Sequence, residues 1–167
     1  MITKIGDFEL GQNLDASVLK ELPLNDIVST VKNAPSFMKN KQTRDFSEQD
    51  YKDITDIEKA YEVENLAFFG VNWNAFIATV GDKISRISTY YTTTDKDGAD
   101  LIFRKIFIYV TNDMGKHNKN PFLSKRYIWY CDEGNVLVEK SSMWGQYCVG
   151  LVIEHNREGV HQSLKAI

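Results

Sequence analysis

The sequence has few of the residues that build linkers, disulfide frameworks or fibres: two Cys, three Pro and ten Gly in 167 positions. So little proline and glycine leaves little room for long flexible linkers, and a chain of this length forms about one domain. Hydrophobic residues make up 43% of the chain and charged residues 26%, which excludes a disordered tail, a collagen-like fibre and a coiled coil. We expect one domain over 1–167, with its core in 65–156 and a tail at 157–167.

Long apolar runs and a leader peptide are also missing. The longest apolar runs, 66–71, 106–110 and 149–153, are far shorter than the roughly 20 residues that cross a bilayer. The N-terminus lacks the apolar core and the cleavage site of a signal peptide. Cys131 and Cys148 stand in strand-like apolar segments, where we expect buried, inert thiols on neighbouring strands. These features predict a soluble, cytoplasmic protein that does not enter a membrane.

Recognisable catalytic and metal-binding motifs are absent as well. His117, His155 and His161 are 38 and 6 residues apart, and neither spacing fits a HExxH helix or a short zinc pair. The sequence contains no phosphate-binding glycine loop and no Gly-x-Ser-x-Gly elbow. Cys148 and His155 are a nucleophile and a base, but seven residues of strand would separate them by about 23 Å. We therefore expect no enzymatic activity, no metal and no cofactor.

Apolar periodicity predicts an α+β fold, in which an antiparallel sheet of about five to seven strands packs against one long amphipathic helix. Ala99, Ile102, Ile106 and Val110 recur at helical spacing, and Gly115 stands where that helix would end. Strands are predicted at 66–71, 75–80, 84–92, 127–131, 136–140 and 147–154.

Shorter elements are predicted near the N-terminus. A strand around Ile5 and Phe8 comes first, followed by a short helix that Asp15 caps and Pro23 stops. The apolar stretch 27–31 fits a strand or a helix equally well. The fold should therefore include shorter N-terminal helices beside the long one.

The net charge is concentrated in one polar segment, residues 39–64. It holds five Lys and Arg against eight Asp and Glu, which equals the whole formal charge of −3, and the other 141 residues balance at 15 against 15. A capping-box pattern begins at Ser47, and a helix through Ile54 and Ile57 would turn carboxylates such as Glu58 to solvent. Such a surface is either a solvated helix face or a docking site that steers a cationic protein.

Two tryptophans stand at predicted loop or strand-end positions. Trp73 lies between two Asn and Trp144 lies in Ser-Met-Trp-Gly-Gln, and a Trp in such a place either anchors a partner or closes the core. Together with the polar segment, this gives the candidate partner-binding residues Asp45, Glu48, Asp50, Tyr51, Asp53, Asp56, Glu58 and Trp144.

A basic loop supports an alternative function. Residues 116–126 include four Lys and Arg and no acid, and they lead into aromatic residues, as a single-stranded nucleic-acid binder requires. No RNP-type motif accompanies them, and the chain as a whole is acidic. The candidate nucleic-acid contacts are Lys116, Lys119, Lys125, Arg126 and Trp129.

A wider pattern resembles that of small bacterial proteins of two-layer α+β build. It comprises Gly6-Asp-Phe-Glu-Leu-Gly11 before a short helix, a hairpin, an amphipathic helix that ends in Met-Gly, and a Trp-bearing strand pair. Among such proteins, cytosolic immunity proteins that neutralise toxins are similar in size, acidity and lack of a catalytic motif. The resemblance implies an inhibitor that binds and occludes a basic toxin such as a nuclease, and it carries over no individual residue. The oligomeric state stays open.

Overall fold

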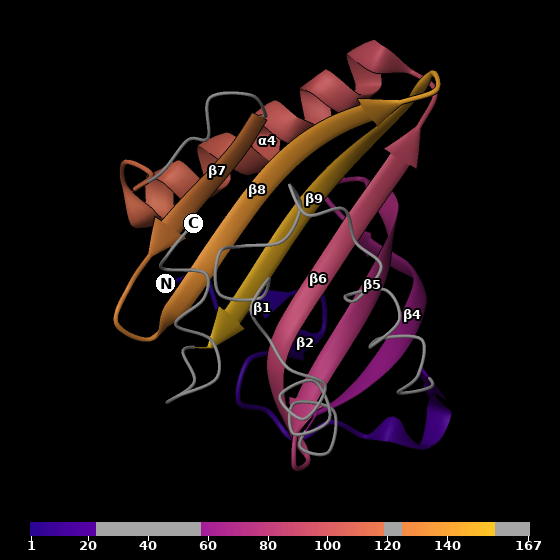
Figure 1. Cartoon of the computed structure of the whole chain (residues 1–167), viewed down its shortest axis with the longest axis vertical. Helices are drawn as coiled ribbons and strands as arrows, with labels where there is room; N and C mark the ends of the chain where they lie inside the picture. The colour runs from indigo at the N-terminus through magenta and orange to yellow at the C-terminus, as the bar shows by residue number, and fades with distance from the viewer. Residues whose placement is uncertain (23–57, 119–124, 156–167) are drawn as a thin grey trace, which may run out of the picture.

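The computed structural model describes residues 1–22, 58–118 and 125–155, which form a large antiparallel sheet with one long helix on one side (Figure 1). The strand order in this sheet is β3-β4-β5-β6-β9-β8-β7. Its strands are β3 (Lys20–Glu21), β4 (Glu58–Phe68), β5 (Val71–Val80), β6 (Lys83–Thr93), β7 (Lys125–Tyr130), β8 (Gly134–Met143) and β9 (Gln146–His155).

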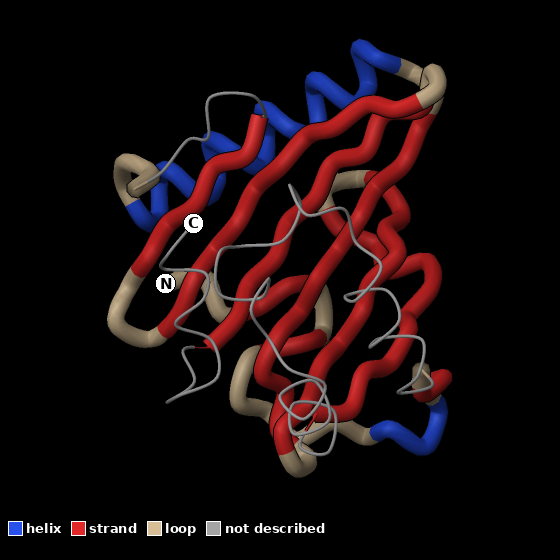
Figure 2. Tube along the Cα trace, viewed as in Figure 1, coloured by secondary structure: helices blue, strands red, loops and turns tan. Residues whose placement is uncertain are grey.

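Two three-stranded meanders make up most of this sheet. In the first, tight turns join β4, β5 and β6, and in the second they join β7, β8 and β9 (Figure 2). The helix α4 (Lys96–Met114) connects the meanders, and antiparallel pairing of β6 with β9 joins them into one sheet. The predicted antiparallel sheet of five to seven strands with one long helix is confirmed at this coarse level, in keeping with an α+β fold, whereas the predicted shorter N-terminal helices are not found among the described residues.

The core lies between α4 and one face of the sheet. Ala99, Ile102, Ile106 and Val110 are the buried helix positions, so the spacing that predicted the helix also marks the side that packs. The helix ends at Gly115, whose φ of 75° is a conformation that glycine adopts without steric cost.

The N-terminal residues form strands and a single helical turn. β1 (Lys4–Ile5) and β2 (Phe8–Glu9) make a small hairpin on the same side of the sheet as α4 (Figure 1). The helix predicted after Asp15 is wrong in length, because η1 (Ala16–Val18) is one turn of 3-10 helix. Asp15 does cap this turn, since its Oδ1 atom accepts from the backbone N–H of Ser17 at 3.1 Å. Val18 is 84% exposed, so a longer helix would gain little packing.

The end of the polar segment is a strand, which corrects its predicted helical form. β4 begins at Glu58 and pairs with β5 as far as Phe68. Its antiparallel register runs from Glu58 with Val80 to Val63 with Ala75, which a helix cannot form, and Tyr61 is buried on this strand. Ile54, Ile57 and the stretch 27–31 lie outside the described residues.

The first hairpin turns earlier along the chain than the predicted strand limits, 66–71 and 75–80, suggested. The turn falls at Phe69 and Gly70, and β5 then runs without a break through Asn72, Trp73 and Asn74. Trp73 has no exposed surface, and its indole N–H donates to the carbonyl of Phe68 at 3.0 Å. Trp73 therefore belongs to the core.

Both cysteines are half-buried thiols. Cys148 lies in β9, whereas Cys131 follows β7, so β8 separates the two and the prediction of neighbouring strands is wrong. Burial raises the pKa of each thiol above its ordinary value. In the described part of the chain, no helix has both the length and the apolar character to span a membrane.

Candidate protein-binding surface

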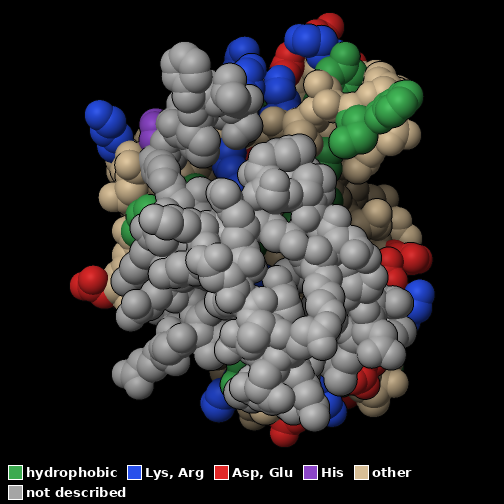
Figure 3. Space-filling view, in the orientation of Figure 1, with side chains coloured by type: hydrophobic (Ala, Val, Ile, Leu, Met, Phe, Trp, Pro, Cys, Tyr) green, Lys and Arg blue, Asp and Glu red, His purple; other side chains and the backbone are tan. Residues whose placement is uncertain are grey.

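The turn between β8 and β9 carries the most exposed large hydrophobic side chain among the described residues. Trp144 is 94% exposed and its neighbour Met143 is 65% exposed. Figure 3 shows hydrophobic side chains standing clear of the surface at this end of the molecule, beside charged side chains (green, upper right). The sequence allowed either tryptophan to be a core residue or a partner anchor. The structure distinguishes them, because Trp73 is buried and Trp144 is exposed to solvent.

The backbone at Trp144 adopts a conformation that suits other residues better. Met143 pairs with Gln146, and between them Trp144 and Gly145 have φ angles of 56° and 78°. Two-residue hairpin turns with two positive φ angles strongly favour Asn-Gly or Asp-Gly. A bulky residue in the left-handed region is uncommon, since its Cβ crowds the following carbonyl. Local backbone geometry therefore does not explain why a tryptophan occupies this position.

A second turn of the same kind shows how such strain is compensated elsewhere in the chain. Phe69 and Gly70 join β4 to β5 with φ angles of 50° and 77°. The Phe69 ring packs against Tyr109 of α4, with 5.4 Å between ring centroids, and against Phe68 at 5.7 Å. Trp144 makes no ring contact with any described residue. Its indole is left for a group outside the described chain.

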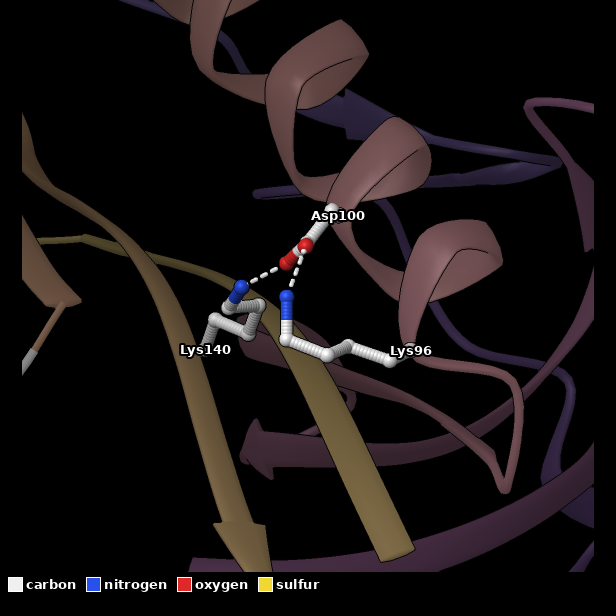
Figure 4. A network of polar contacts seen from close by, with 3 residues as sticks. All are labelled: Lys96, Asp100 and Lys140. Carbon is white, nitrogen blue, oxygen red and sulfur yellow. Dashed lines mark hydrogen bonds and ion pairs between the residues drawn. The ribbon is translucent and has the colours of Figure 1, made fainter.

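A small polar network fixes the strand that leads to this turn. Asp100 of α4 pairs with both Lys96 and Lys140, at 2.8 Å from the Lys96 amine (Figure 4). The Lys140 amine also lies 5.9 Å from the centre of the Phe103 ring, a cation–π contact. Lys140 precedes Met143 by three residues on β8. The network therefore ties β8 to the first turns of α4 four residues before Trp144, and a strand fixed in this way lowers the entropy lost on binding.

The predicted acidic surface and Trp144 do not meet within the described residues. Glu58 pairs with Val80, beside the turn to Lys83, at one end of the sheet. Thr93 pairs with Tyr147, near Trp144, at the other end. β6 spans this interval with 11 residues, or roughly 35 Å. The other predicted acidic-surface residues, Asp45, Glu48, Asp50, Tyr51, Asp53 and Asp56, lie outside the described residues.

The described part of the polar segment is partly neutralised. Glu62 lies 3.4 Å from the Lys20 amine of β3, and its side chain is about a quarter exposed. Glu64 is exposed on the same strand. An exposed pair of this kind contributes little to stability, but it removes one of the carboxylates that a cationic partner would meet.

The basic loop does not form a nucleic-acid surface with Trp129. That side chain is 1% exposed, and its indole N–H donates to the carbonyl of Gly115 at 2.9 Å. Arg126 projects from the opposite face of β7 and lies 3.9 Å from Glu139. Lys116 and Lys125 are exposed, and Lys119 lies outside the described residues. The Trp129 ring is thus unavailable for base stacking, because the strand period turns it into the core.

Known proteins offer no guide to this surface. The chain matches no protein-family model, no curated protein and no solved structure. In the ranges 1–22, 58–118 and 125–155, no three His, Cys, Asp or Glu residues come together as a metal site. The function is therefore argued from the exposed turn.

Sequence reasoning identified Trp144 but missed the features that give it meaning. Met143 was not selected, although it is the last residue at the exposed end of β8. A useful signal was available in the sequence: Trp-Gly and Phe-Gly stand between strand-like segments where Asn-Gly is the usual turn. Which of the two aromatic residues would be covered depends on how α4 packs against the sheet, and only the structure shows that.

Proposed function

We propose that this chain is a non-catalytic protein-binding protein that acts as an immunity protein, binding a basic toxin such as a nuclease and blocking it by occlusion. Trp144 at the β8–β9 tip is the observation that carries the proposal. Tryptophan is enriched among the residues that dominate binding energy at protein interfaces. Its placement at a two-residue turn between paired strands favours recognition of a preformed shape.

The conformation of the tip supports a binding role more strongly than exposure alone. A non-glycine residue in the left-handed region costs roughly 1–2 kcal/mol, and such costs persist mainly where function requires them. The Phe69 ring recovers part of that cost by packing on Tyr109. For Trp144, burial in a partner's pocket would supply the equivalent gain, since an aromatic side chain buries a large apolar area.

The charge distribution supports a cationic partner. The segment 39–64 holds the whole excess of acidic residues, and a field of one sign accelerates encounter with an oppositely charged protein. In this proposal the carboxylates from Asp45 to Glu58 steer the approach, and Trp144 anchors the complex. Because the mechanism is masking, no bond is made or broken.

Affinity purification of the tagged chain from its native host tests this function. We expect the wild-type chain to retain a basic protein that Trp144→Asn fails to retain, because Asn keeps the turn and removes the indole. Val18→Asn is the matched control: Val18 is also an exposed apolar residue, at 84%, but it lies in η1. Reversing Asp50, Asp53 and Asp56 to Lys should weaken the same capture.

Two results would contradict the proposal. One is recovery of no basic protein by the wild-type chain. The other is equal recovery by the wild-type chain and Trp144→Asn, which would remove Trp144 from the interface. Loss of binding with the charge-reversed chain but not with Trp144→Asn would confine recognition to the acidic segment and contradict the anchoring role of the tip.

A further inference from the structure

A small pocket opens on the helix side of the sheet, where three segments distant in sequence meet. It has a volume of about 250 Å³ and lies between the β1–β2 hairpin, the β4–β5 turn and α4. Phe68, Phe69 and Tyr109 supply its aromatic lining. Ile5 and Leu151, both almost fully buried, also line it, so the pocket reaches the hydrophobic core. Aromatic walls over a buried aliphatic base are typical of a site for a small apolar ring.

The edge of this pocket is built from two left-handed residues. Phe69 has a φ of 50° and Gly6 a φ of 57°. A Cβ atom on Gly6 would stand 2.8 Å from Cδ1 of Leu66, so only glycine lets the hairpin approach this closely. Phe69 places its ring edge-on to Tyr109, at an interplanar angle of 73°. Two separate turns, one of them holding the non-glycine residue Phe69 in the left-handed region, thus shape one concave surface.

The polar groups of the pocket indicate what kind of molecule it takes. Lys4 is the single charged residue that lines it, and no ion pair among the described residues engages Lys4. The Tyr109 hydroxyl adds a hydrogen-bonding group on a half-exposed side chain. A few polar groups beside a largely apolar lining set the orientation of a bound ligand.

We infer that this pocket binds a planar aromatic monocarboxylate of one or two rings. The ring would lie against Phe68, Phe69 and Tyr109, and the carboxylate would face the Lys4 ammonium. The pocket is too small for a peptide, and its single cation matches a single negative charge. A ligand of this size in an open site should bind with a dissociation constant on the order of 1 mM.

Naphthoate titration followed by NMR tests this inference, because the chain has a reporter beside the pocket. The Trp73 indole N–H donates to the carbonyl of Phe68 at 3.0 Å, and the two rings stack at 4.4 Å. We expect 1-naphthoate to shift the Trp73 indole signal saturably and to leave the Trp144 signal in place. Among three tryptophans, the Trp144→Asn spectrum assigns the Trp144 signal and should retain naphthoate binding.

Three variants test the charged part and the aromatic part of the pocket separately. Lys4→Gln should weaken naphthoate by about two- to fivefold and leave the neutral analogue 1-naphthalenemethanol unchanged. Phe69→Gly keeps a residue suited to the turn and should weaken both ligands by about three- to tenfold. Tyr109→Ala, at a half-exposed helix position, should act in the same direction as Phe69→Gly.

The inference is overturned if naphthoate produces no saturable shift up to 10 mM, which is about ten times the expected dissociation constant. Equal affinity of the wild-type chain and Phe69→Gly, or equal shifts of all three indole signals, would also overturn it. These outcomes do not depend on the proposed immunity function, since the Lys4 and Phe69 variants leave Trp144 in place and should still capture the basic partner.

Discussion

At the scale of single residues, Trp144 and Phe69 make a natural comparison. Both precede a glycine in a two-residue hairpin turn, and both have a positive φ angle near 50°. The Phe69 ring is covered by Tyr109 and Phe68, whereas the Trp144 ring is in solvent. The same backbone cost is therefore offset inside the molecule at one turn and not at the other.

Replacement of each aromatic residue by Asn should change stability in opposite directions. Trp144→Asn should raise the free energy of unfolding by about 1 kcal/mol, because Asn tolerates the left-handed region and no packing is lost. Phe69→Asn should lower it by roughly 1–3 kcal/mol, since the ring contacts with Tyr109 and Phe68 disappear. Urea unfolding of the two variants and the wild-type chain measures the direction of each change in the free energy of unfolding. A destabilised Trp144→Asn would show that the indole packs within the chain.

The thiol of Cys148 should react slowly in the folded chain. Burial is the largest cause that raises its pKa, Glu139 raises it further, and a hydrogen bond from Thr92 partly opposes them. At pH 8 the folded chain thus contains less thiolate than the unfolded chain, and thiolate is the reactive form. Iodoacetamide should alkylate Cys148 in Cys131→Ser more slowly in buffer than in urea, and equal rates would contradict the buried placement.

The raised pKa of the Cys148 thiol also makes the stability of the fold depend on pH. Because folding raises the thiol pKa, the neutral form is favoured in the fold, and its stabilising contribution is present below pH 9, the ordinary thiol value. It is lost as the pH rises through the higher folded pKa. Cys148→Ser should therefore reduce the slope of stability against pH above about pH 9.

At the scale of elements, the end of α4 is joined to β7 by one side chain. The Trp129 indole N–H donates to the carbonyl of Gly115, just beyond the helix. Trp129→Phe keeps an aromatic ring in the core but leaves that carbonyl without this donor, which should cost about 1–3 kcal/mol. Thermal unfolding measures the loss, and an unchanged midpoint would mean that the hydrogen bond contributes nothing to holding the helix end.

The turn between β7 and β8 depends on a close approach of two backbones. A Cβ atom on Gly134 would lie 2.0 Å from the carbonyl oxygen of Glu154, so Gly134→Ala should displace β8 from β9 and cost at least about 2 kcal/mol. Gly98→Ala is the matched control. Its Cβ would meet the side chain of exposed Asp95, which can move aside, and alanine favours a helix by about 1 kcal/mol. Urea unfolding should therefore separate the two variants by roughly 3 kcal/mol.

At the scale of the whole molecule, the elements that could be predicted from the sequence are those with a long repeat of apolar residues. Four apolar residues from Ala99 to Val110 define the buried side of α4, and five turns of helix make such a pattern hard to mistake. The first part of β4 was missed because the alternation of Tyr61 and Val63 with Glu62 and Glu64 is short and stands at the end of a highly charged segment, so the predicted strand began only at Leu66. A short helix after Asp15 was predicted from a correct cap, but the cap starts only one turn.

The candidate site was only partly predictable, because a short sequence context does not determine burial. Trp73 and Trp144 both stand among polar or small residues, yet the register of β5 places the first in the core and a two-residue turn places the second in solvent. Trp129 was expected on a surface, but its alternation along β7 turns it toward α4. Pairing register and helix placement involve residues far apart in the chain, and local patterns do not contain them.

In the proposed complex, we assign different roles to the acidic segment and to the exposed turn. Glu58 and Trp144 lie near opposite ends of β6, and the roughly 35 Å between them exceeds by far the Debye length of about 8 Å at physiological salt. The carboxylates should therefore govern the association rate and its salt dependence. Trp144 should govern the dissociation rate, as buried anchors do.

The affinity of the co-purified basic protein for the wild-type chain and for Trp144→Asn is the most direct test of the central claim. The measurement needs both chains folded, at the same salt concentration, with Val18→Asn as the control. We predict that Trp144→Asn weakens binding about 30-fold or more, through faster dissociation, as expected for a dominant interface residue. Affinity unchanged within about twofold would contradict the claim that the β8–β9 tip anchors a protein partner.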